Sequence, residues 1–241
     1  MPSLFISDLH LDSKRPDILR AFLHFLEHDA RRVEALYILG DLFEAWIGDD
    51  DDSELARTCQ QALKQLSDSG TLLYYMHGNR DFLLGDAFAR KTGGEILPDP
   101  TLISLYGTPT LLMHGDSLCT SDTDYMAMRQ QLRSSEWQQN LLAQPLEERR
   151  QLAKQLRMAS AEANSNKAED IMDVTPAAVV DIMRQHNCRR LIHGHTHRPQ
   201  VHSLNVEGAA AERIVLGDWD QFLWFLRVDD EGHTLEKRPI A

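Results

Sequence analysis

Apolar residues alternate between two spacings along this chain. Short continuous apolar runs, which are typical of buried strands, occur at positions 4–7, 35–39, 72–76, 102–105, 110–113, 190–192, 214–216 and 222–228. Between several of these runs, apolar residues recur at helical spacing. One helix is predicted from Pro16, with a buried face of Ile18, Phe22, Phe25 and Leu26. A second is predicted between a cap at Ser53 and Gly70, with a buried face of Leu55, Cys59, Ala62, Leu63 and Leu66.

This alternation of strands and helices predicts an α/β fold in which helices cover the faces of a sheet. Gly107 and Pro109 lie between two of the predicted strands and indicate a hairpin. Residues 121–167 break the alternation, because they contain no strand pattern and consist almost wholly of helix-forming residues. That length is too great for a simple connection, so we predict a helical insertion, or cap, over 121–167 with a break at Pro145. The segments 1–120 and 168–241 would then form the core domain.

The net charge of the chain makes some classes of binding partner less plausible than others. Its 25 basic and 37 acidic residues among 241 give a net charge of −12. An acid excess of this size argues against a dedicated nucleic-acid binder, so we expect no nucleic-acid partner. It does not exclude an anionic substrate, because a bound metal ion can reverse the sign of the local charge.

Cysteine usage and the N-terminal segment favour a cytosolic compartment. Cys59, Cys119 and Cys188 are widely separated, and no Cys-x-x-Cys pair is present, so neither a disulfide framework nor a thiolate zinc site is indicated. The first residues lack the basic region of a signal peptide, and no apolar run is long enough to cross a bilayer.

Five short polar motifs share one placement, since each follows a predicted strand. They are Asp8-Leu-His10, Gly40-Asp41, Gly78-Asn79-Arg80-Asp81, His114-Gly115-Asp116 and His193-Gly194-His195-Thr196-His197. Open α/β sheets place their ligand sites at such strand ends. Each motif alone is weak, because a single histidine in a strand usually has a structural role, but the ordered set predicts a metal site.

The predicted ligands are carboxylates, imidazoles and an amide. This mixture suits Mn²⁺, Fe²⁺ or Zn²⁺ better than an all-oxygen Mg²⁺ or Ca²⁺ site. Seven such ligands are too many for one ion with open positions, and they fit two ions about 3.5–4 Å apart with one bridging carboxylate.

In this order the five motifs resemble the signature of the calcineurin-like metallophosphoesterase superfamily. The resemblance implies a β-sandwich flanked by helices in four layers. It implies one ion on Asp8, His10, Asp41 and His197, and a second on Asp41, Asn79, His114 and His195, with Asp41 bridging. A pair of ions of this kind activates water and clamps phosphoryl oxygens for in-line attack.

Arg80 narrows the predicted reaction. Many phosphomonoesterases of this superfamily carry a histidine at the corresponding place, where it acts as an acid toward the leaving oxygen. An arginine cannot donate that proton, but its guanidinium can stabilise phosphate charge. Arg80 therefore favours a leaving group that needs no proton, as in a pyrophosphate bond, although a conservative exchange on an exposed loop is the alternative.

A closer resemblance extends over nearly the whole chain. The segments FISDLHLD, YILGDLFEAWIGDD, MHGNRDFLLG, LLMHGDSLCT and LIHGHTHRP are similar to those of the UDP-2,3-diacylglucosamine pyrophosphatases. This resemblance implies attack of water at the α-phosphorus of UDP-2,3-diacylglucosamine, with UMP and 2,3-diacylglucosamine 1-phosphate (lipid X) as products, in lipid A biosynthesis. It also implies two Mn²⁺ ions per subunit and peripheral contact with the cytoplasmic face of the bacterial inner membrane. We expect a monomer.

The same resemblance implies roles for individual residues. Arg80, His195 and Asp41 would be catalytic. The implied substrate-binding residues are Asn79, Arg80, Asp122, Ser160, Asn164, Lys167 and His195. Arg157 is a further candidate, because Arg157, Ser160, Asn164 and Lys167 fall on one stripe of a predicted helix and could grip a phosphosugar. A solvated helix face is the alternative reading of that stripe.

The residues of the predicted cap indicate only in part that it contacts a lipid substrate or a membrane. Its apolar residues include Tyr125, Met128, Leu132, Trp137, Leu141, Leu142, Leu146, Leu152 and Leu156. Polar segments separate them, so docking to a membrane through a basic amphipathic face is only weakly indicated, and the acyl-chain preference stays open. The acidic run 49–52 lies close to Asp41 in sequence, and we expect it to form a solvated loop.

Two other functions stay open at this point. The chain could be a phosphodiesterase of the same superfamily that acts on nucleotides without a lipid, although the cap argues against this. It could also be a non-catalytic scaffold with a vestigial site, which the complete ligand set disfavours.

Overall fold

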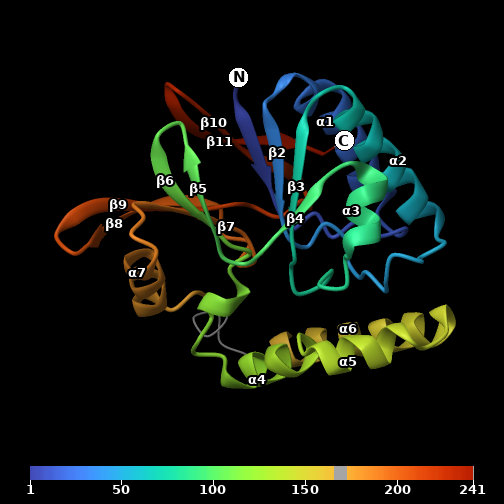
Figure 1. The fold of residues 1–241 in the computed structure, drawn as a ribbon. Helices are drawn as coiled ribbons and strands as arrows, with labels where there is room; N and C mark the ends of the chain where they lie inside the picture. The colour runs from blue at the N-terminus through green and yellow to red at the C-terminus, as the bar shows by residue number, and fades with distance from the viewer. Residues whose placement is uncertain (166–172, 241) are drawn as a thin grey trace.

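Two β-sheets pack face to face at the centre of the molecule (Figure 1). The computed structural model describes residues 1–165 and 173–240, apart from the side chains of residues 161 and 163–165. The first sheet has the strand order β11-β10-β1-β2-β3-β4. Its strands are β1 (Ser3–Ile6), β2 (Ala35–Leu39), β3 (Leu72–Met76), β4 (Glu95–Leu97), β10 (Phe222–Asp229) and β11 (Gly232–Pro239).

The second sheet has the order β5-β6-β7-β9-β8. Its strands are β5 (Thr101–Leu105), β6 (Thr108–Leu112), β7 (Arg190–His193), β8 (Gln200–Val206) and β9 (Ala209–Val215). β5 and β6 form the antiparallel hairpin predicted at Gly107. β1, β2 and β3 run parallel in the first sheet, as do β6, β7 and β9 in the second.

Helices cover the outer faces of both sheets. α1 (Pro16–His28), α2 (Glu54–Asp68) and α3 (Asp86–Thr92) pack on the first sheet, and α7 (Pro176–Gln185) packs on the second. Strand β1 shows the layering, because Phe5 points into the core between the sheets while Leu4 and Ile6 pack under the helices. A strand buried on both faces is a continuous apolar run, which is why the sequence reveals it. The predicted four-layer α/β sandwich is confirmed.

Three helices fill most of the segment predicted as a cap. They are α4 (Thr123–Leu132), α5 (Ser135–Leu142) and α6 (Leu146–Ser165), and we call them the cap helices. The side chains of Asp122 and Ser134 cap α4 and α5 by accepting hydrogen bonds from backbone N–H groups, and Pro145 stands just before α6. Figure 1 shows the cap helices along one edge of the sandwich. The division into core and cap domains remains a prediction. Within the described residues, no helix is both long and apolar enough to cross a membrane.

Candidate dinuclear metal site

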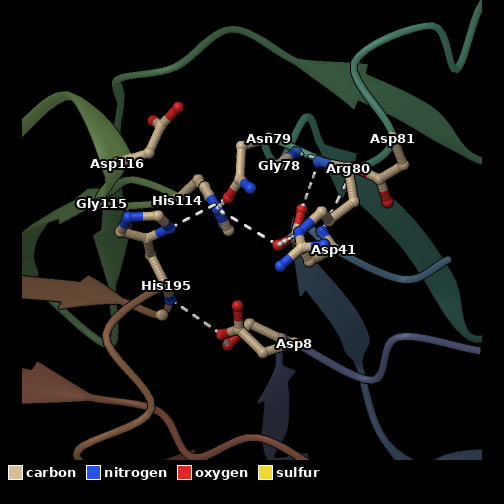
Figure 2. Close-up of polar contacts among 12 residues, drawn as sticks. Asp8, Asp41, Gly78, Asn79, Arg80, Asp81, His114, Gly115, Asp116 and His195 are labelled. Atoms are coloured by element: carbon tan, nitrogen blue, oxygen red, sulfur yellow. Dashed lines mark hydrogen bonds and ion pairs between the residues drawn. The ribbon is translucent and has the colours of Figure 1, made fainter. Parts of the chain in front are cut away.

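The seven predicted ligands meet where the two sheets present the carboxyl ends of their parallel strands. Asp8 and His10 follow β1, Asp41 follows β2 and Asn79 follows β3, while His114 follows β6 and both His195 and His197 follow β7. Figure 2 shows Asp8, Asp41, Asn79, His114 and His195 turned toward a common centre. Because the sheets pack face to face, both contribute side chains to that centre.

The backbone at this centre adopts an uncommon conformation. Five of the predicted ligands have positive φ: Asp8 at 55°, His10 at 49°, Asp41 at 55°, His195 at 69° and His197 at 55°. Non-glycine residues seldom adopt this left-handed region, and such strain is concentrated at functional sites, where the surrounding structure holds it in place. The strained backbone therefore marks these loops independently of their sequence motifs.

One cluster combines Asp8, His10, Asp41 and His197. The Nε2 atoms of His10 and His197 lie 3.2 Å apart, and Nε2 of His197 lies 3.5 Å from Oδ1 of Asp8. Nε2 of His10 lies 3.9 Å from Oδ2 of Asp41. Oδ1 of Asp8 is buried and has no hydrogen-bond partner among the described residues, so this anionic oxygen faces the cluster with the ion-pair contact to His197.

A second cluster combines Asp41, Asn79, His114 and His195. The carboxamide of Asn79 lies 3.0 Å from Nε2 of His114 and 3.0 Å from Nδ1 of His195. Nε2 of His114 lies 3.8 Å from Oδ2 of Asp41. Nδ1 of His114 is 2.9 Å from the carbonyl oxygen of Leu39, so it donates there and leaves the Nε2 lone pair facing the cluster. Asp41 borders both clusters, as a bridging ligand must.

The pKa values at the centre reflect buried carboxylates that need positive charge. Burial favours the neutral ring of His114, but the charges of Asp41 and Asp116 outweigh it and raise its pKa to about 9. Burial also opposes charge on His197, yet contact with Asp8 raises its pKa to about 9. By contrast, burial and the charge of His114 lower the pKa of His195 to about 4. A neutral imidazole is the form that binds metal.

This donor set fits a pair of divalent ions. Ligand atoms of Asp8, His10 and His197 lie within 4.8 Å of one another, and so do those of Asp8, Asp41 and His114. The unpartnered Oδ1 of Asp8 and the Nε2 atoms of His10, His114 and His197 converge there. Divalent cations would supply the missing positive charge without requiring protons on the histidines.

The comparisons with known proteins agree with this geometry. The sequence pattern of the calcineurin-like phosphoesterase family matches residues 1–199. The UDP-2,3-diacylglucosamine hydrolase of Pseudomonas aeruginosa (strain UCBPP-PA14) is 55% identical over 240 residues, which cover 100% of both chains. The hydrolase of the same name from Chromohalobacter salexigens is 56% identical over 233 residues, covering 96% of this chain and 95% of the relative.

The chain belongs to the calcineurin-like phosphoesterase family. Members of this family are hydrolases with a dinuclear metal site, and two groups are candidate ligands of that site: Asp8 with His10 and His197, and Asp8 with Asp41 and His114. The prediction of a metallophosphoesterase from the five sequence motifs is therefore confirmed.

A buried aspartate connects two of the loops that carry predicted ligands. Oδ1 of Asp81 accepts hydrogen bonds from the N–H groups of Gly78 and Asp41, at 2.8 and 3.2 Å, and Oδ2 accepts one from Leu42 at 2.7 Å. Burial and the nearby charge of Asp41 raise the pKa of Asp81 to about 6. Gly78 has to be glycine, because a Cβ atom there would lie 2.0 Å from Oδ1 of Asp41.

Three carboxylates support the site although sequence reasoning assigned them no role. Glu44 faces His10, Asp218 faces His197, and buried Asp116 accepts hydrogen bonds from Tyr125 and Arg129 of α4. Asp116 ends the His-Gly-Asp motif, and Asp218 comes shortly after strand β9, so their placement at strand ends was a usable signal. Glu44 has no such signal, since it is one of many acidic residues in loops.

The predicted substrate residues fall into two groups. Asn79, Arg80, Asp122, Ser160 and His195 line one cleft beside the metal clusters, so the fold brings them together. The side chains of Asn164 and Lys167 lie outside the described residues, so their roles stay predictions. Arg157 also comes to this region, where its guanidinium contacts Glu44.

An apolar groove leads away from this cleft beneath the cap helices. Its cap side is formed by Tyr125, Met128, Leu132, Trp137, Leu141, Leu152 and Leu156. Its core side includes Trp46, Ile47, Phe82 and Leu83. The polar residues of its lining are Asn79, Arg80, Arg129, Arg133, Arg149, Arg157 and Ser160. These seven apolar residues of the cap thus line the groove on the side of the core, whereas Leu142 and Met158 are exposed, although the sequence left their direction open.

The acidic run 49–52 is only partly the solvated loop expected from sequence. Asp50 and Asp52 are exposed, but they pair with Arg149 and Arg150 of α6. Asp49 accepts hydrogen bonds from the backbone of Gly85 and Phe88, at 2.9 Å each. The expectation is wrong in this respect, because the run connects the core to the cap.

Proposed function

We propose that this chain hydrolyses the pyrophosphate bond of UDP-2,3-diacylglucosamine through attack of water at the α-phosphorus, releasing UMP and 2,3-diacylglucosamine 1-phosphate. The observation that carries the proposal is the apolar groove, which shares Asn79, Arg80 and Ser160 with the cleft at the metal clusters. A substrate with acyl chains next to a phosphorylated sugar needs an apolar and an anion-binding surface side by side. The names of the relatives agree with this substrate.

Cationic side chains lie where the phosphates would enter. Nε of Arg80 is 3.9 Å from Oδ2 of Asp41, which places its guanidinium at the border of both clusters. Arg157 comes from the opposite side, on α6. Guanidinium groups bind phosphate oxygens through paired hydrogen bonds, so Arg80 is suited to stabilise the charge that develops on the leaving phosphate.

The remaining residues have roles that follow from their positions. Bound divalent ions would activate the attacking water and neutralise phosphoryl charge. Asp41 would hold them as the bridging carboxylate, and His195 would remain neutral as a ligand that also borders the substrate cleft. Asp122 and Ser160 would contact the sugar and nucleotide portions from the cap.

The physiological setting is part of the same proposal. We propose two Mn²⁺ ions per subunit, because the mixed oxygen and nitrogen donors suit this ion. A monomer in peripheral contact with the cytoplasmic face of the inner membrane could reach a lipid substrate. Met128, Leu142 and Met158 of the cap helices, with exposed fractions of 39%, 42% and 65%, are available for such contact.

The decisive assay offers UDP-2,3-diacylglucosamine to the purified chain with Mn²⁺ and follows release of UMP. We expect release that a chelator abolishes and that His195→Ala suppresses. De-acylated UDP-glucosamine serves as the matched substrate. Equal turnover of the two would favour a phosphodiesterase without lipid specificity, and absence of UMP from both would contradict the proposed reaction.

A further inference from the structure

Glu44 stands between the predicted metal site and the cap. It lies in the loop after β2, and its backbone N–H donates a hydrogen bond of 3.1 Å to the carbonyl oxygen of Leu11. The loop of Glu44 is thereby tied to the loop that follows His10. The side chain of Glu44 is 29% exposed, so it is partly shielded from water.

One carboxylate oxygen of Glu44 faces a predicted metal ligand. Oε2 lies 3.2 Å from Nδ1 of His10, and this buried ring nitrogen has no other polar partner among the described residues. The opposite ring nitrogen, Nε2, points into the cluster with His197. A carboxylate behind a ligating histidine fixes the tautomer and the direction of the ring and makes it a better ligand.

The other oxygen of Glu44 contacts the cationic residues of the substrate cleft. Oε1 accepts a hydrogen bond of 2.7 Å from Nε of Arg157 and forms an ion pair with its Nη2 at 2.6 Å. The same oxygen lies 3.4 Å from Nη1 of Arg80. Arg157 belongs to α6 and Arg80 to the loop after β3, so one carboxylate joins the cap to the core. No other carboxylate among the described residues contacts both a predicted metal ligand and Arg157.

We propose that Glu44 is a positioning residue with two simultaneous functions: it orients His10 toward its ion and holds Arg157 and Arg80 at the phosphate-binding cleft. Binding of the ion and binding of the phosphates are coupled through this one side chain. The inference rests on the proposed metal site, but its main measurement requires no substrate.

Asp218 provides a matched control on the same ion. Its Oδ2 lies 3.6 Å from Nδ1 of His197, so it stands behind the second histidine of the cluster as Glu44 stands behind the first. Within the described part of the chain, Asp218 forms no contact with an arginine. Arg157→Ala is the complementary control, because it removes the cationic partner and leaves His10 untouched.

The experiment measures Mn²⁺ affinity by calorimetry on the substrate-free full chain, and then KM at saturating Mn²⁺. Glu44→Gln should weaken Mn²⁺ binding roughly 10–100-fold, as loss of a carboxylate behind a metal-bound histidine does elsewhere. It should also raise KM even when the ions are restored. Asp218→Asn should weaken Mn²⁺ binding without raising KM, and Arg157→Ala should raise KM without weakening Mn²⁺ binding.

The outcomes separate this proposal from the proposed function. A wild-type chain that binds no Mn²⁺ would contradict the metal site itself. If the wild-type chain and the Glu44→Gln variant bind Mn²⁺ equally well, only the role of Glu44 is overturned. An unchanged KM in Glu44→Gln would overturn that role as well. If Glu44→Gln fails to fold, Glu44→Asp replaces it, because this variant keeps the negative charge. Its shorter side chain cannot reach both partners, so it should bind Mn²⁺ more weakly than the wild type and raise KM. Wild-type values of Mn²⁺ affinity and KM would overturn the proposal.

Discussion

The loops that carry the predicted ligands and the cap helices are held in place by different forces. Asp8, Asp41 and His114 are almost fully buried, with exposed fractions of 0–1%, and their loops are fixed by backbone hydrogen bonds, tight glycines and the carboxylate of Asp81. The cap helix α4 has no buried residue at all, and α5 has only Leu141. The first region is part of the core, while the second lies against it.

Three arginines of the cap contact the core through polar groups, beside the apolar packing of Trp137, Leu141 and Leu152. Arg133 donates a hydrogen bond of 2.9 Å to the carbonyl oxygen of Gly78, Arg149 donates one of 2.6 Å to that of Ile47, and Arg157 pairs with Glu44. Such contacts are directional and can be exchanged for water, unlike the packing of the core. Under the proposed function, the core would supply the metal ligands and the cap would supply much of the substrate-binding surface. Each prediction below tests that division, from the largest expected effect to the smallest.

Asp41→Ala should have the largest effect, because it removes the carboxylate that borders both clusters. We expect loss of metal and a fall in activity beyond the roughly 10–100-fold typical of outer residues around a metal. Metal content per chain, measured by mass spectrometry, checks this. Ser160→Ala in the cap should retain the wild-type metal content, and equal loss in both variants would remove the distinction between core and cap.

Arg80→Ala should lower kcat by about 10²–10³-fold while both ions stay bound, because it removes charge stabilisation needed in the transition state. Steady-state kinetics alongside metal analysis measures the two effects separately. Loss of the ions instead would assign Arg80 a structural role in the metal site.

Leu156→Ser should change KM, whereas Arg80→Ala changes kcat. Loss of one apolar contact in the groove is expected to raise KM for the diacylated substrate about 10-fold, with kcat little changed. Met158→Ser is the matched control, because Met158 lies on the same helix but is 65% exposed and does not line the groove. If both variants raise KM equally, the groove is not the acyl-binding surface.

Arg149→Ala should loosen the cap and affect stability more than chemistry. It leaves the carbonyl oxygen of Ile47 without its partner, which costs about 1–3 kcal/mol. Chemical denaturation measures this loss, and hydrogen exchange should show it concentrated in α6. Arg150→Ala, which removes an exposed ion pair, should cost no more than about 1 kcal/mol; equal losses would mean that burial of Arg149 has no influence.

The smallest effect is expected at the cysteines. Burial raises the pKa of Cys59 and of Cys119 to about 12, and Cys188 is buried as well. At pH 8 almost no thiolate is present in the native chain, so an alkylating reagent should label the thiols only after denaturation. Rapid labelling of Cys119, the cysteine nearest the cap, would show that the cap opens far enough to admit the reagent.

Prediction from the sequence was most successful where buried positions produce a regular spacing of apolar residues. The helix predicted from Pro16 spans Pro16–His28 and buries all four expected residues, and the Ser53 cap accepts its hydrogen bond from Ala56. Strands β4, β8 and β11 escaped prediction because they lie at sheet edges, where polar residues face water and apolar runs are short.

At the candidate site, the sequence revealed the ligands but not their surroundings. Asp8, Asp41 and the other motif residues are recognisable because each directly follows a strand. Glu44 and the inward direction of Leu152 and Leu156 were not recognisable, since they depend on how α6 lies against the core. Contacts between segments about a hundred residues apart, such as Arg157 with Glu44, leave no local pattern.

The parallel pairing of β1 with β2 and of β2 with β3 has a consequence for folding. Asp8, Asp41 and Asn79 follow these strands at once, so their positions depend on the alignment of Ser3 with Ala35 and of Ala35 with Leu72. A slip of one residue would displace a ligand by roughly 3.3 Å, far beyond the tolerance of about 0.2 Å in a coordination bond. During refolding, a metal ion should therefore bind only after these strands have paired in the correct register, so the rate of metal binding would report when that register forms.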